Sequence, residues 1–192
     1  LEAATKAADW AASRPLVGNW NYNSFSVFLL ARSYRVSGKT EHLDSAVNKA
    51  LLGVIPGQLQ RGPRAGRWLD AHNARPAYHY ILLRGLAELA LALPADHAAR
   101  PRVMAALRLG LKARNQDFLQ QGAPNKDSAM ETLLIVNRGF AQDKPFLAET
   151  LSADALDALA KLVSAQARRG QVPLGPAPWG QFLEYVTERG AR

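Results

Sequence analysis

The segment PAYHYILLRGLAELALAL, residues 76–93, carries the strongest helical pattern of the chain. Pro76 suits the first helical position, where its missing N–H would have no partner. The residues that follow are apolar on nearly every side and are interrupted mainly by Arg84 and Glu88. A helix that is apolar all round is typically packed between other helices. We therefore predict an inner helix over this segment and expect the rest of the chain to be organised around it.

The loop in front of this helix, GRWLDAHNAR at residues 66–75, concentrates aromatic and titratable side chains. Tyr78 and His79 fall in the first turn of the helix that the loop enters. Such groups at the mouth of a buried helix are typical of a functional site rather than of packing. The candidate site residues from this stretch are Arg67, Trp68, His72, Asn73, Arg75, Tyr78 and His79.

Helical periodicity continues in pairs along the chain, and no segment shows a strand pattern. We expect a helix cap at Asn23 or Ser24, another at Thr40 and another at Ser152. The tail over residues 170–180 contains three prolines and is predicted to be a loop. The predicted helices are 1–13, 23–38, 40–53, 76–93, 99–120, 128–140, 152–168 and a short one at 181–188, which give three αα-hairpins at about 23–53, 76–120 and 128–168.

An internal repeat supports this interpretation. Asn21, Asn73 and Asn125 are spaced by 52 residues, and Leu30, Leu82 and Leu134 keep the same spacing. Hairpins of one period would start at the same end of the assembly, so that their first turns form one rim. We predict a single all-α domain over residues 1–192, with repeated αα-hairpins in an α/α-toroid-like, incomplete arrangement.

Composition limits the function classes. The chain has 24 Lys plus Arg against 16 Asp plus Glu, a net charge of +8, which favours polyanionic partners. The basic residues are scattered and form no nucleic-acid motif, so nucleic acid ranks below acidic polysaccharide. No apolar run is long enough to span a membrane. With no cysteine, thiolate metal sites are excluded. His72 and His79 lack further ligands at a metal-binding spacing, so we predict no metal and no cofactor. The oligomeric state is left open.

Two stretches resemble the heparinase II/III-like and alginate-lyase-like polysaccharide lyases. Residues 76–83 are similar to their Pro-x-Tyr-His segment and the apolar helix that follows, and residues 21–25 resemble their Asn-His-Gly-Ser-Trp segment. The resemblance covers about residues 20–93. It implies an α/α toroid, a secreted or periplasmic location, and β-elimination on a glycan that contains uronate. Tyr22 stands where the family has histidine, and Asn23 stands where it has glycine.

The resemblance also implies roles for individual residues. Asn21 would bind the uronate carboxylate, and Tyr78 would transfer protons, with His72 or His79 as a second proton carrier. The positive end of the helix and a neighbouring arginine, Arg67 or Arg75, would favour loss of the tyrosine proton. The substrate-binding candidates are Trp20, Tyr22, Arg67, Trp68, Asn73 and Arg75.

Other interpretations stay open. A glycoside hydrolase would need two facing acids, for which only Asp70, Asp127 and Glu131 qualify. A non-catalytic helical-repeat module could bind an acidic glycan or a protein with the same rim. Asn73 and Asn125 are good turn formers before helices. Trp20 and Trp68 could stack on sugar rings or fill the core. His42 and His97 are expected at the surface. Because the chain begins at Leu1, it could be a processed form or a fragment of a longer protein.

Overall fold

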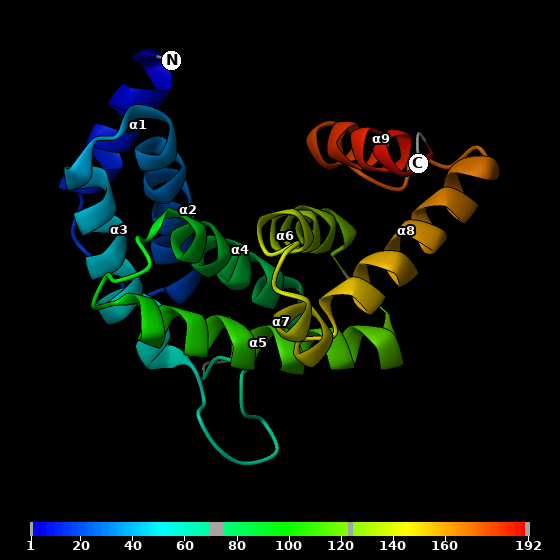
Figure 1. The fold of residues 1–192 in the computed structure, drawn as a ribbon, viewed down its shortest axis with the longest axis horizontal. Helices are drawn as coiled ribbons and strands as arrows, with labels where there is room; N and C mark the ends of the chain where they lie inside the picture. The colour runs from blue at the N-terminus through cyan, green and yellow to red at the C-terminus, as the bar shows by residue number, and fades with distance from the viewer. Residues whose placement is uncertain (1, 70–74, 123–124, 191–192) are drawn as a thin grey trace.

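The computed structural model describes residues 2–69, 75–122 and 125–190, which form an all-helical fold (Figure 1). Within these ranges there is no strand, and Gln58 and Trp68 make one isolated bridge. No described helix combines the length and apolarity that a bilayer crossing needs. The elements are α1 (Glu2–Ser13), α2 (Trp20–Ser37), α3 (Thr40–Gly53), η1 (Ile55–Gly57), α4 (Pro76–Ala92), α5 (Arg100–Gln121), α6 (Lys126–Gly139), α7 (Lys144–Glu149), α8 (Ser152–Arg168) and α9 (Pro176–Gly190).

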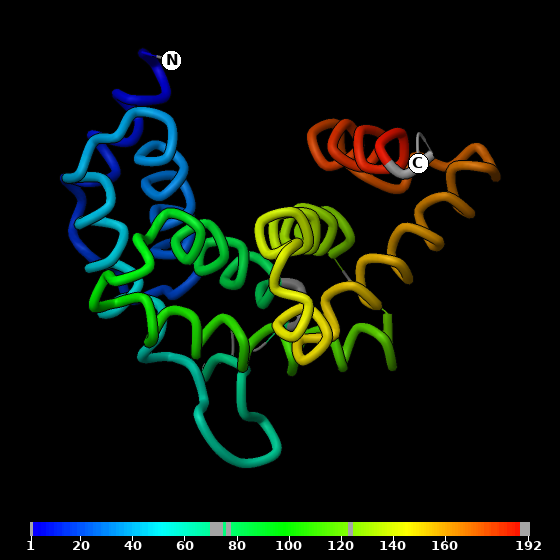
Figure 2. Tube along the Cα trace, viewed as in Figure 1, coloured from blue at the N-terminus to red at the C-terminus, as the bar shows by residue number. Residues whose placement is uncertain are grey.

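The helices follow one another along an open arc, with α1 at one end and α8 and α9 at the other (Figures 1 and 2). The helices α4 and α5 run antiparallel: Arg100, which begins α5, donates to the carbonyls of Ala90 and Leu93 at the end of α4. At the other end of this pair, Tyr80 in the first turns of α4 bonds Asn115 near the end of α5. The helices α2 and α4 run in the same direction, since early residues pair in Ser24 and Ile81 and late residues pair in Arg35 and Glu88. The helix α6 is parallel to α4 as well, since Thr132 bonds the Tyr80 carbonyl and Gly139 lies against Leu91.

The helix α4 is the centre of the core, as the apolar segment predicted. It packs against α2, α3, α5 and α6. Four of its leucines are wholly buried, and the polar interruption at Glu88 is buried as well. Because a buried carboxylate needs a partner, Glu88 lies between the guanidinium groups of Arg35 at 2.7 Å and Arg32 at 3.6 Å, both on α2. The buried leucines are Leu82, Leu83, Leu86 and Leu89.

The starts of the helices differ from the predicted caps. The side chain of Asn19, not of Asn23 or Ser24, caps α2 and accepts a hydrogen bond from the Asn21 N–H at 2.9 Å. Asn21 and Tyr22 therefore lie inside the first helical turn rather than in a loop. Thr40 is the first residue of α3, after Lys39, which makes no side-chain cap. Several residues that favour the cap position lie within a few positions of the start of α2, so cap preference alone did not identify the residue that caps it.

The third predicted hairpin begins at Lys126, two residues before its predicted start at residue 128. Asn125 caps α6 and accepts from the Ser128 N–H at 3.2 Å, which confirms its interpretation as a structural asparagine. The predicted bounds of α8, 152–168, are confirmed. The predicted cap Ser152 is wrong, since it is already helical and Leu151 precedes it with a φ of 54°. The one-and-a-half-turn helix α7 was not predicted, because six residues are too few to show a period.

The predicted loop over 170–180 is wrong in its second half, since α9 begins at Pro176. The first turn of a helix has no intrahelical partner for its N–H groups, so it accepts Pro176 and Pro178 without losing a hydrogen bond. His42 is also not at the surface as predicted. It is wholly buried, and its Nε2 lies 2.9 Å from the Asp9 carboxylate of α1. His97 is half-buried and accepts a hydrogen bond from the Ala99 N–H.

Candidate functional site

The first turns of α2 and α4 lie at the same end of two closely packed, parallel helices. The Ser24 hydroxyl donates to the carbonyls of Ile81 and Leu82 at 3.1 and 3.2 Å. Asn21 lies one turn before Ser24, and Tyr78 lies one turn before Ile81 and Leu82. Residues three and four apart share a helix face, so Asn21 and Tyr78 stand at matching levels on the two facing helix surfaces. Asn21 is 2% exposed and Tyr78 is half-buried.

His79 and Trp68 are packed beneath these turns. His79 is 2% exposed, and its ring lies 6.1 Å from the ring of Trp68 at an angle of 54°. Trp68 is wholly buried and donates its indole N–H to the Val54 carbonyl at 2.8 Å. Trp20 is half-buried against the backbone of Gly57. The structure therefore places Trp68 and Trp20 in the packing role that the sequence left open.

The Arg67 guanidinium is bound to a carboxylate of this chain and is not available to a polyanion. Its Nε and Nη2 donate to the two carboxylate oxygens of Asp117 on α5, at 3.1 and 2.5 Å. Such a bidentate pair is geometrically specific and charge-assisted, so it ties the loop after η1 to α5. Arg114 also faces Asp117, at 3.8 Å. Arg75, which precedes α4, is exposed and stays a candidate for contact with an anion.

Tyr22 is exposed, with 61% of its surface accessible. It lines a surface cavity of about 480 Å³ between the end of α1 and the first half of α2. Trp10, also 61% exposed, and Phe25, 43% exposed, line the same cavity. The guanidinium of Arg14 lies 4.7 Å from the centre of the Trp10 ring. The cavity therefore offers aromatic faces beside one cation.

Three of the sequence candidates are outside the described residues: His72, Asn73 and the acid Asp70. Of the other two acids considered for hydrolysis, Asp127 accepts from the Gly175 N–H at 3.1 Å, and Glu131 pairs with Arg84. Both carboxylates thus have structural partners. Within the described ranges, no three His, Asp or Glu side chains gather as a metal ion would require.

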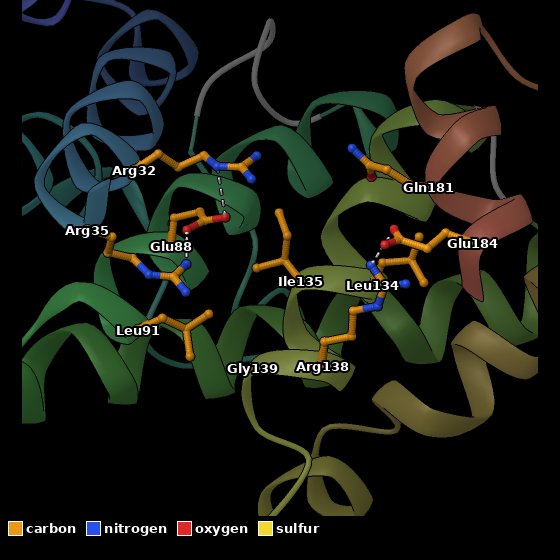
Figure 3. Close-up of a pocket in the computed structure, with 10 residues that line it drawn as sticks. All are labelled: Arg32, Arg35, Glu88, Leu91, Leu134, Ile135, Arg138, Gly139, Gln181 and Glu184. Carbon is orange, nitrogen blue, oxygen red and sulfur yellow. Dashed lines mark hydrogen bonds and ion pairs between the residues drawn. The ribbon is translucent and has the colours of Figure 1, made fainter. Parts of the chain in front are cut away.

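A second polar centre, which sequence reasoning missed, lies at the opposite end of the same helices (Figure 3). It is a cavity of about 380 Å³ walled by side chains of α2, α4, α6 and α9. The polar interruption at Glu88 in the apolar helix was the available signal for it. The lining residues are Arg32, Arg35, Glu88, Leu91, Leu134, Ile135, Arg138, Gly139, Gln181 and Glu184.

Comparisons of this chain with protein-family models, with curated proteins and with solved structures found no match.

Proposed function

We propose that this chain acts on an acidic polysaccharide at the first turns of α2 and α4, as a lyase that works by β-elimination. We further propose that its helical pairs are repeated hairpins of an incomplete α/α toroid. The parallel course of α2, α4 and α6 supports the second proposal, because it collects the first turns of successive hairpins at one end. The net charge of +8 supports an anionic substrate.

One observation carries the enzymatic proposal: the Ser24 hydroxyl joins α2 to the Ile81 and Leu82 carbonyls, so that Asn21 and Tyr78 stand at matching levels. In β-elimination the C5 proton leaves, a C4=C5 double bond forms and the C4–O4 bond breaks, with a proton returned to O4. An amide that donates to the substrate carboxylate makes the C5 proton more acidic. A tyrosine beside it can carry the proton.

A non-catalytic acidic-glycan module is the second candidate, and burial favours it. Asn21 and His79 are each 2% exposed, whereas Tyr22 and Trp10 are each 61% exposed. Exposed aromatic faces stack on sugar rings without proton transfer. In that case the cavity between α1 and α2 would provide the contact and Tyr78 would have no chemical role.

The two candidates are separated by incubating the chain with alginate, heparan sulfate, chondroitin, hyaluronate and pectate. The ultraviolet absorbance of the unsaturated uronate is then followed over time. We expect a rise on one polymer that Tyr78→Phe abolishes. Tyr34→Phe is the matched control, because it removes a hydroxyl from the opposite end of α2. A rise that survives Tyr78→Phe would contradict the assigned role of Tyr78. Polymer binding without any rise would favour the non-catalytic module.

A further inference from the structure

The cavity of Figure 3 has two polar walls that face each other across an apolar floor. Arg32 and Arg35 of α2 form one wall, and Gln181 and Glu184 of α9 form the other. We propose that this cavity binds a small hydroxylated carboxylate, such as a sugar acid, and that Arg32 and Gln181 hold the carboxylate. Its volume of about 380 Å³ suits a single small ligand.

Arg32 retains the donors that a carboxylate needs. Its nearest carboxylate, Glu88, lies 3.6 Å from its Nε, which is too far for a hydrogen bond. Among the described residues it makes no hydrogen bond, and its side chain is 54% exposed. A guanidinium carries five N–H donors, and a planar pair of them matches a carboxylate. Arg35, in contrast, is already bonded to Glu88 at 2.7 Å.

Gln181 provides a neutral donor from the opposite wall. Its side chain extends toward Arg32 across the space above Ile135 (Figure 3). Within the described part of the chain the Gln181 amide makes no hydrogen bond either, and the residue is half-buried. A guanidinium and an amide that approach from two sides can bind the two oxygens of one carboxylate, or a carboxylate and a neighbouring hydroxyl.

The remaining lining fits the rest of such a ligand. Leu91, Leu134 and Ile135 form an apolar surface on which the carbon face of a ring can lie. Glu184 is 60% exposed and pairs with Arg138 at 3.1 Å, so its carboxylate can accept a hydroxyl hydrogen while it stays neutralised. The lining contains three arginines against two glutamates, which favours a ligand with one negative charge.

This site is separate from the proposed catalytic site. Arg32 lies 11 residues after Asn21 on α2, or about 16 Å along the helix axis at 1.5 Å per residue. The inference therefore does not depend on lyase activity. Failure of the absorbance assay would leave this proposal intact, and failure of the binding experiment below would leave the lyase proposal intact.

The test is a titration of the chain with D-glucuronate and, in parallel, with D-glucose, which has the same ring and no carboxylate. Methyl NMR signals of Leu91 and Ile135 report occupation of the cavity, and the methyl signals of Ile55, on η1, serve as the remote reference. We expect saturable shifts at Leu91 and Ile135 with glucuronate and affinity for glucose that is lower by about tenfold or more, since a charged hydrogen-bond pair is lost.

Arg32→Met keeps an unbranched stem and removes the guanidinium with its donors. Arg35 still pairs with Glu88 in this variant, so the fold is expected to persist. We expect glucuronate affinity to fall by about tenfold or more in Arg32→Met and to fall several-fold in Gln181→Leu. The matched control is Arg108→Met, which removes a similarly exposed arginine, paired with Glu149 at 3.1 Å, from α5.

Three results would overturn the proposal. The first is the absence of glucuronate-dependent shifts at Leu91 and Ile135. The second is equal affinity for glucuronate and glucose. The third is an Arg32→Met variant that is folded by circular dichroism and binds glucuronate as well as the Arg108→Met control does.

Discussion

The Ser24 hydroxyl of α2 occupies the space that a side chain on Gly85 of α4 would fill. A Cβ at Gly85 would lie 2.4 Å from Ser24 Oγ and 2.7 Å from the Ser24 carbonyl oxygen. The second contact is with backbone, which cannot move aside as a flexible side chain can. The glycine therefore sets how closely α2 and α4 approach, and with it the matching levels of Asn21 and Tyr78.

Gly85→Ala is expected to lower the free energy of unfolding by about 1–3 kcal/mol, because the two helices must move apart. Gly180→Ala on α9 is the control: nothing lies within 4 Å of its added Cβ, so alanine's better helix propensity should stabilise by about 0.5–1 kcal/mol. Urea denaturation of both variants measures the difference. Stabilisation by Gly85→Ala would contradict the close packing of these helices.

Tyr80 is expected to matter for stability rather than for chemistry. It is 1% exposed, and its hydroxyl donates to Asn115 Oδ1 at 2.9 Å. Tyr80→Phe leaves that buried acceptor without its donor and should cost about 1–3 kcal/mol in unfolding free energy. Tyr34→Phe, at a half-buried position, should cost less than about 0.5 kcal/mol. Equal losses in the two variants would contradict the role assigned to the Tyr80 hydrogen bond.

Tyr80 should also make the protein lose stability at alkaline pH. Burial raises the pKa of the Tyr80 hydroxyl, and the nearby Arg114 guanidinium offsets only part of this rise. The unfolded tyrosine loses its proton first, near pH 10, so rising pH then favours the unfolded chain. Stability should be fully present below pH 10 and fall above it. Urea midpoints at pH 9, 10 and 11 should fall less steeply in Tyr80→Phe than in the wild type.

Asp9 on α1 should contribute to a loss of stability at acidic pH. Two hydrogen bonds hold the pKa of the Asp9 carboxyl below its usual value of 3.8. The larger effect comes from Lys39, which precedes α3, and the smaller from His42 on α3. The stability that these two hydrogen bonds to Asp9 contribute is therefore present above pH 3.8 and is lost as pH falls through the lowered pKa. Thermal melts between pH 6 and pH 2 should show a smaller acid-induced loss in Asp9→Asn. Asp44→Asn, an exposed carboxylate on α3, should retain the loss of the wild type.

Substitutions of Trp68 and Tyr22 should have different effects, because Trp68 packs in the core and Tyr22 lies on the proposed binding surface. Trp68→Phe removes the indole donor of the Val54 carbonyl and leaves a buried gap, so it should cost about 1–3 kcal/mol in stability without changing the affinity for an acidic polysaccharide. Tyr22→Ala should weaken polysaccharide binding with little change in stability, because the ring is 61% exposed. Denaturation and polymer titration measure both effects. Loss of affinity in a folded Trp68→Phe variant would return Trp68 to the binding surface.

The helices were predictable where the signals were local. Pro76 marked the start of α4, and Gly38 ends α2 in a left-handed conformation with a φ of 71°. The predicted bounds of α8 agree with the structure, although Ser152 is its first helical residue and not its cap. Prediction failed where two local interpretations compete. Pro176 is compatible with a loop and with a first helical turn, and contact with the rest of the chain selects the helix.

The candidate site was predictable only in its position along the chain. The sequence indicated that the starts of two helices carry Asn21, Tyr78 and His79, but it could not show that Asn21 and His79 are almost wholly buried. Nor could it show that Arg67 is held by Asp117, because these two residues are 50 positions apart. The cavity at the other end of the helices was missed for the same reason, since its walls come from four helices.

Local sequence was therefore sufficient to locate most helices and to identify α4 as the inner one, because backbone hydrogen bonding and apolar spacing act over a few residues. Tertiary packing assigned each polar side chain to the interior or to the surface. His42 and Glu88 are buried because Asp9 and the arginines of α2 approach them from distant parts of the chain. Burial of a polar group depends on such partners, and their approach is a property of the assembled helices.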